Sequence, residues 1–110
     1  MGRRVTSALT MAEAGRAILR ARADGRLTAD DERAAVRALG RFERRCYVMA
    51  VTDAVLARAR RPFPVEPVRT LDAVHLATVE LLGEPPPLVT IVTRDVRVRD
   101  NARVLGYAVE

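Results

Sequence analysis

Residues 69–95 read RTLDAVHLATVELLGEPPPLVTIVTRD, and this stretch decides the fold. Its first part is a helical sequence, with Thr70 suited to cap the start and Gly83 suited to end it. EPPP is a loop, and LVTIVT at 88–93 is a continuous, mostly β-branched run of the kind found in buried parallel strands. A helix followed by such a strand predicts an α/β layered domain with a mostly parallel sheet.

The rest of the chain repeats this alternation on both sides of the quoted stretch. We expect strands at residues 3–7, 46–51 and 107–109, and helices at 10–25, 28–45, 53–60 and 94–106. Thr28 and Thr52 are suited to cap two of these helices. The prolines in residues 60–69 mark a rigid connection and not a strand. Residues 1–110 are therefore expected to form a single domain, the usual outcome for a chain of this length.

Composition favours a phosphate-rich partner. The 19 basic residues are all arginine and the net charge is +5. Arginine holds phosphate with a planar fork, although GC-rich coding also enriches arginine. No apolar run approaches the length of a membrane span, the start lacks a signal peptide's hydrophobic stretch, and the single Cys46 can form no internal disulfide. These features predict a cytoplasmic protein without a membrane segment.

Three acids lie where α/β sheets build their sites, outside the carboxyl ends of the strands. Asp95 directly follows LVTIVT, Asp72 lies in the first turn of its helix, and Glu13 lies in the helix after the first strand. Carboxylates that converge repel one another and persist where a divalent cation neutralises them, and their oxygens suit Mg²⁺ or Mn²⁺. Taken singly, each acid has a simpler explanation. Asp72 and Asp95 could be ordinary first-turn residues that interact favourably with the helix dipole, and Glu13 could be a solvated residue paired with Arg16.

Three segments together resemble the PIN domain, and in particular toxins of the VapC type from bacterial toxin–antitoxin operons. They are SALTMAEAGRAILR, VRTLDAVHLATVELL and VTIVTRDVRVRDNARVLGYAV, and the likeness runs from about residue 5 to the C-terminus. The resemblance implies a PIN-like three-layer α/β/α fold and a Mg²⁺- or Mn²⁺-dependent ribonuclease. Glu13, Asp72 and Asp95 would be its catalytic metal ligands, and the metal would activate water and stabilise the pentacovalent phosphate.

The resemblance also implies supporting residues and partners. Thr93 belongs to the family's TxD element and would orient a ligand or water, and Arg16 and Arg94 would contact phosphate. His75 is better explained by packing or a fixed hydrogen bond than as a base. The partners implied are RNA, an antitoxin protein and a second copy of the chain.

One departure from the family bears on activity. PIN domains begin with a central strand that ends in an Asp, whereas this sequence starts at the family's second strand, so we expect an N-terminally truncated fold with the central first strand absent. Its neighbours would lose a shared hydrogen-bond partner, and the metal site would lose one ligand. Two alternatives therefore stay open. One is a weakened or inactive PIN-like module that binds an antitoxin-like partner or RNA. The other is a dimer subunit that associates through the helices at 8–23 and 28–45.

Overall fold

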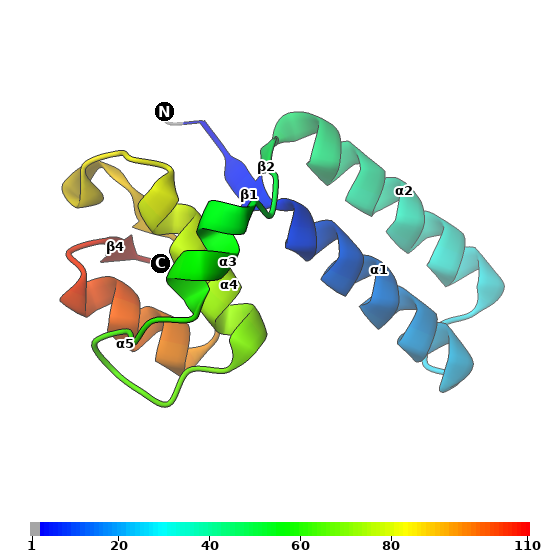
Figure 1. The fold of residues 1–110 in the computed structure, drawn as a ribbon. Helices are drawn as coiled ribbons and strands as arrows, with labels where there is room; N and C mark the ends of the chain where they lie inside the picture. The colour runs from blue at the N-terminus through cyan, green and yellow to red at the C-terminus, as the bar shows by residue number, and fades with distance from the viewer. Residues whose placement is uncertain (1–2) are drawn as a thin grey trace. The chain divides into compact units, whose positions relative to one another are not determined.

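The computed structural model describes residues 3–110 as two compact units, the first ending at Ala50 and the second beginning at Val51. In both units helices alternate with short parallel strands, which confirms the α/β class (Figure 1). Over the described range no helix is both long and apolar enough to cross a membrane. The single domain over residues 1–110 and the missing central strand both stay predictions.

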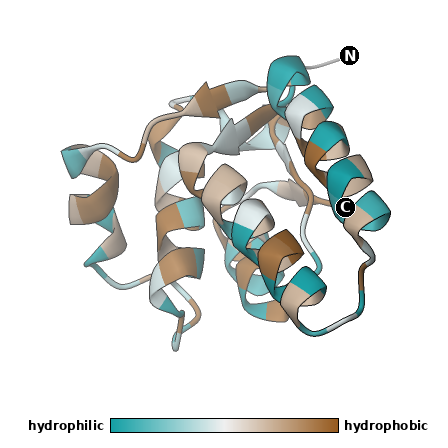
Figure 2. Ribbon diagram, turned by 90° about the vertical axis from the view of Figure 1, so that its right-hand side faces the viewer, coloured by the Kyte–Doolittle hydropathy of each residue, from teal (hydrophilic) through white to brown (hydrophobic). Residues whose placement is uncertain are grey.

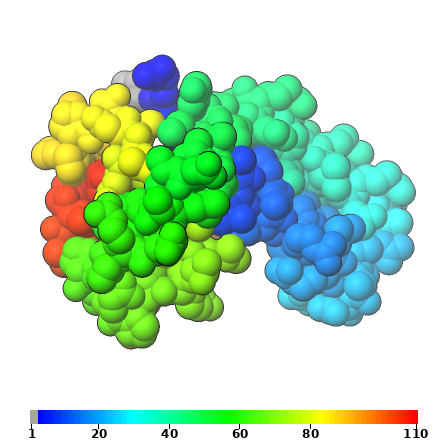
Figure 3. All heavy atoms as spheres, in the orientation of Figure 1, coloured from blue at the N-terminus to red at the C-terminus, as the bar shows by residue number. Residues whose placement is uncertain are grey.

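The first unit is a helical hairpin closed by two strands. It contains β1 (Val5–Ser7), α1 (Ala8–Ala23), α2 (Ala29–Arg45) and β2 (Tyr47–Met49). β1 and β2 pair in parallel, with Val5 opposite Tyr47 and Ser7 opposite Met49. α1 and α2 pack against each other, and their atoms are coloured blue and cyan in Figure 3.

Local hydrogen bonds explain where these two helices begin and end. The Ser7 hydroxyl accepts the Leu9 N–H at 3.1 Å at the start of α1. Thr28 and Asp31 form a capping box at the start of α2, and these bonds from Thr28 hold the pKa of Asp31 below its ordinary value. Gly25 follows α1 with φ +77°, a left-handed conformation that glycine adopts without strain. The helices predicted at 10–25 and 28–45 are confirmed.

The second unit holds the apolar core. It contains α3 (Asp53–Ala59), α4 (Thr70–Leu81), the 3₁₀ turn η1 (Pro86–Leu88), β3 (Thr90–Ile91), α5 (Val96–Val104) and β4 (Ala108–Val109). The buried apolar residues that the structure describes all belong to it: Val55, Phe63, Ala73, Val74, Leu76, Ala77, Ile91, Val98, Ala102 and Tyr107. Hydrophilic and hydrophobic residues alternate along the helices of the structure (Figure 2). α3 packs on α4, and α5 packs on both α4 and β4.

The strand predicted at 88–93 is much shorter than expected. Only Thr90 and Ile91 are paired, in parallel with Ala108 and Val109 of β4. Val92 is 78% exposed. β3 starts late because the prolines before it turn the chain into η1. Beyond Ile91 the pairing weakens to one long bond of 3.4 Å, from the Thr93 N–H to the Glu110 carbonyl. The four strands accordingly form two separate two-stranded sheets, β1–β2 and β3–β4.

The predicted cap of α4 is also wrong. Arg69, not Thr70, stands at the N-cap position, and its side chain makes no capping hydrogen bond. The Arg69 carbonyl accepts the Ala73 N–H at 2.8 Å, so Thr70 is already the first helical residue. Asp72 consequently lies in the first turn, as predicted.

Candidate metal-binding carboxylate pair

Asp95 lies in the connection between β3 and α5, at the start of α5. It is the N-cap of α5, and its Oδ1 accepts the Val98 N–H at 3.0 Å. The Thr93 Oγ1 accepts the backbone N–H of Asp95 at 3.0 Å. The side chain of Asp95 is 32% exposed, and its second oxygen, Oδ2, takes no part in the capping bond. Thr93 therefore positions the backbone that carries this carboxylate.

Asp72 lies at the rim of the core. It belongs to the first turn of α4, its side chain is 19% exposed, and it is followed by the buried Ala73 and Val74. The partial positive charge of the helix N-terminus favours a carboxylate at this position. The helix start and the neighbouring core thus hold Asp72 in place, with its side chain partly covered.

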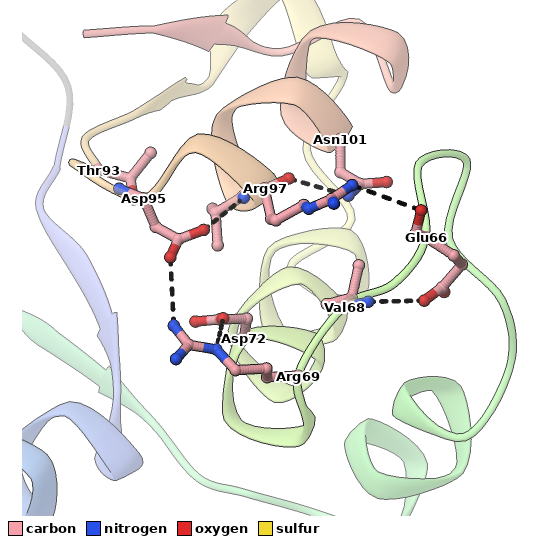
Figure 4. Close-up of polar contacts among 9 residues, drawn as sticks. Glu66, Val68, Arg69, Asp72, Thr93, Asp95, Arg97 and Asn101 are labelled. Carbon is pink, nitrogen blue, oxygen red and sulfur yellow. Dashed lines mark hydrogen bonds and ion pairs between the residues drawn. The ribbon is translucent and has the colours of Figure 1, made fainter.

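A single guanidinium joins the two carboxylates. Arg69 Nε lies 3.3 Å from Asp72 Oδ2, and Arg69 Nη2 lies 3.4 Å from Asp95 Oδ2. Figure 4 shows the Arg69 side chain reaching both acids, one from the start of α4 and one from the start of α5. Two carboxylates that are distant in the sequence therefore share one cation, an arrangement that limits their mutual repulsion.

The segment before Arg69 is tied to α5 by a buried asparagine. Asn101 is 0% exposed, and its Oδ1 accepts the Val65 N–H at 2.8 Å. Its Nδ2 donates to the carbonyls of Val65 and Arg97, both at 2.9 Å. The Glu66 carboxylate adds a local turn by accepting the N–H of Val68 at 2.8 Å (Figure 4). The helix that carries Asp95 at its start thus also holds the segment that leads to Arg69.

A second anchor ties the beginning of this segment to α3 and α4. Arg58 donates from Nε and Nη2 to the two oxygens of Glu80, at 2.7 and 3.1 Å. The same guanidinium lies over the Phe63 ring at 3.9 Å and donates to the Arg61 carbonyl at 3.1 Å. These partly buried contacts anchor the start of the proline-containing connection, whose rigidity stays a prediction.

The other residues predicted for the site are Glu13, Arg16 and Arg94. Glu13 is half-buried and Arg16 is exposed, both on α1 of the first unit, while Arg94 is exposed and immediately precedes Asp95. Within residues 3–110, no group of three or more His, Cys, Asp or Glu side chains is placed to hold a metal ion. Because Glu13 belongs to the other unit, its membership of the site stays a prediction, and so do the roles of Arg16 and Arg94.

The carboxylate pair suits a hard divalent cation. Asp72 and Asp95 direct one oxygen each toward a shared positive charge, and both side chains are partly shielded from water. Mg²⁺ typically uses one or two protein carboxylates and completes its coordination with water. The donor set therefore fits the metal that the sequence predicts.

Sequence reasoning missed Arg69 and Asn101. The spacing of Arg69 and Asp72, three residues apart at a helix start, could have indicated their ion pair. Nothing local could have indicated the contact of Arg69 with Asp95 or of Asn101 with Val65, since these partners meet only after the unit has packed.

Comparisons with known proteins agree with this architecture. The PIN domain family model matches residues 1–104. A protein of Mycobacterium tuberculosis strain H37Rv named Ribonuclease VapC35 is 36% identical over 105 residues, which cover 96% of this chain and 70% of that protein. Ribonuclease VapC46 of the same strain is 41% identical over 106 residues, which cover 96% of this chain and 72% of the relative. No solved structure matches the chain significantly. A family match across nearly the whole sequence, with relatives aligned over most of their own length, shows that the chain belongs to the PIN-domain family.

Proposed function

We propose that this protein is a Mg²⁺- or Mn²⁺-dependent ribonuclease of the toxin type, which cuts RNA phosphodiesters at a site made by Glu13, Asp72 and Asp95. The observation that carries the proposal is the convergence of Asp72 and Asp95 on one positive charge. The names of the relatives, both ribonucleases, support the same chemistry.

The proposed roles of the residues follow from their positions in the site. Asp72 and Asp95 present oxygens to the cation, and Thr93 together with the α5 N-terminus keeps the Asp95 carboxylate in one orientation. A divalent ion bound there supplies a Lewis acid and lowers the pKa of coordinated water. We assign contacts with RNA phosphate groups to Arg16 and Arg94, because both are exposed and arginine donates charge-assisted hydrogen bonds to phosphate.

Partners follow from charge and from exposed apolar surface. The arginine-rich composition supports binding of RNA. We expect this binding to take place in the cytoplasm. Leu19, Val36 and Phe42 on α1 and α2 are 51%, 56% and 41% exposed, and in the described part of these two helices no residue is fully buried. An apolar surface of this kind supports association, and we assign it to a second copy of the chain or to the antitoxin protein that the toxin resemblance implies.

The test is RNA cleavage in Mn²⁺ by the wild-type protein and by Asp95→Asn. Asparagine caps helices as well as aspartate does, so the Val98 contact and the melting temperature are expected to persist. Cleavage is expected to fall by more than about 100-fold, because even residues that only orient metal ligands cost about 10- to 100-fold when replaced. Asp100→Asn is the matched control, because it removes the same charge from the same helix.

Several results would contradict the proposal or part of it. Cleavage that survives Asp95→Asn shows that the carboxylate pair is not the active site. Full activity in Glu13→Gln removes Glu13 from the ligand set while leaving the pair in place. RNA binding without divalent-dependent cleavage in the wild type points instead to a binding module, whose affinity would fall steeply with salt.

A further inference from the structure

We propose that Arg69 is a built-in competitor for the metal site: its guanidinium neutralises Asp72 and Asp95 when no divalent ion is bound, and it must move away for the ion to bind. This inference rests on the proposed function and adds a control element to the same site. It starts from one side chain that contacts both carboxylates at 3.3 and 3.4 Å.

The contacts put Arg69 and the divalent ion in competition for the same atoms. Arg69 uses Oδ2 of both aspartates, while Asp95 Oδ1 is engaged by the Val98 N–H. A cation bound by both acids would compete with Arg69 for these Oδ2 atoms, above all at Asp95, where the cap already uses Oδ1. The guanidinium cannot remain in place with a second positive charge beside it, since like charges at contact distance repel.

Exposure makes Arg69 displaceable. Its side chain is 83% exposed, whereas Asp72 and Asp95 are 19% and 32% exposed. Ion pairs with one partner in water contribute little, so the side chain can leave at small cost while the carboxylates stay fixed by their helices. The backbone at Arg69 stays anchored, because its carbonyl accepts the first hydrogen bond of α4. The displaced guanidinium therefore remains at the edge of the site and can return when the metal leaves.

The competition predicts tighter metal binding when Arg69 is replaced. Mn²⁺ affinity is measured by calorimetry on the full chain without RNA, for the wild type, Arg69→Gln and Arg69→Lys. We expect Arg69→Gln to bind Mn²⁺ about 3- to 10-fold more tightly, the factor that corresponds to two exposed ion pairs. Lysine keeps the charge but loses the two-pronged fork, so Arg69→Lys is expected to lie between the two.

The control variant is Arg94→Gln, which removes a positive charge next to Asp95 in the sequence but not the guanidinium that joins the two acids. Its effect on Mn²⁺ affinity is expected to be smaller than that of Arg69→Gln. Equal or weaker affinity in Arg69→Gln, with binding intact in the wild type, overturns the competition and leaves the metal site standing. An equal gain in Arg94→Gln also overturns it, because general charge would then explain the change. Absence of Mn²⁺ binding in every variant overturns the metal site itself and the competition with it.

Discussion

Replacement of Asn101 by alanine is expected to unfold the second unit at markedly lower denaturant. The side chain is 0% exposed and makes three hydrogen bonds, at 2.8, 2.9 and 2.9 Å. Two of them satisfy the N–H and the carbonyl of Val65, and the third reaches the carbonyl of Arg97. Alanine removes all three bonds at once and leaves a small hole beside α5.

The magnitude follows from these contacts. Each neutral hydrogen bond contributes about 1 kcal/mol net, so three bonds contribute about 3 kcal/mol. The unfilled volume adds to this, which brings the expected loss to about 3–5 kcal/mol. For a chain of this size a loss of about 3 kcal/mol corresponds to a melting temperature lower by about 10–20 °C. The effect should concentrate on the segment before Arg69, because Val65 loses its partner there.

Two measurements test this reasoning. Urea unfolding followed by circular dichroism gives the free energy of unfolding, and amide hydrogen exchange reports the protection of the Val65 N–H. Arg103→Ala, an exposed position on the same helix, is the control and is expected to change stability by less than about 0.5 kcal/mol. A loss below about 1 kcal/mol for Asn101→Ala, together with unchanged protection at Val65, would refute the assigned role of the three bonds.

Two further predictions concern the core of the same unit. Arg58→Met should lower the free energy of unfolding in urea by about 2–3 kcal/mol, because the two-pronged contact with Glu80 is partly buried and charge-assisted. A loss below about 0.5 kcal/mol would mean that the pair behaves as an exposed ion pair. Burial, and then the nearby charge of Glu80, raise the pKa of Tyr107 above its ordinary value of 10.0. The folded state therefore holds the phenol proton of Tyr107 more tightly than the unfolded state does. The stability that results from this difference in pKa is complete below pH 10 and is lost as pH rises through the raised pKa. Tyr107→Phe should remove that loss in alkaline melting curves, and identical curves for the two proteins would contradict the assignment.

The helix starts show which features can be predicted from local sequence. Thr52 Oγ1 accepts the Val55 N–H at 3.2 Å, and Asp95 Oδ1 accepts the Val98 N–H at 3.0 Å. Thr28 opens its helix through a capping box, in agreement with the prediction. Each of these bonds joins residues three apart, so the side chain and its partner are brought together by the helix itself. For this reason the amino-acid sequence alone predicts the helices and the places of Asp72 and Asp95 at helix starts.

Strand length and side-chain partners depended on the packed chain. The run at 88–93 has the composition of a buried strand, yet only Thr90 and Ile91 are paired, because a strand extends only as far as its neighbour does. Composition cannot show how long that neighbour is.

By itself, the sequence determined the α/β alternation, the caps at Thr28 and Thr52 and the candidate acids, because hydrogen bonds between residues three apart act within one helical turn. Only the tertiary structure decided that Arg69 would join Asp72 to Asp95, and that Asn101 would hold the segment leading to Arg69. The physical reason is distance along the chain. Partners that lie far apart in sequence meet only where α4, α5 and the connecting segment pack around one core, and the shape of that core is a property of the whole unit.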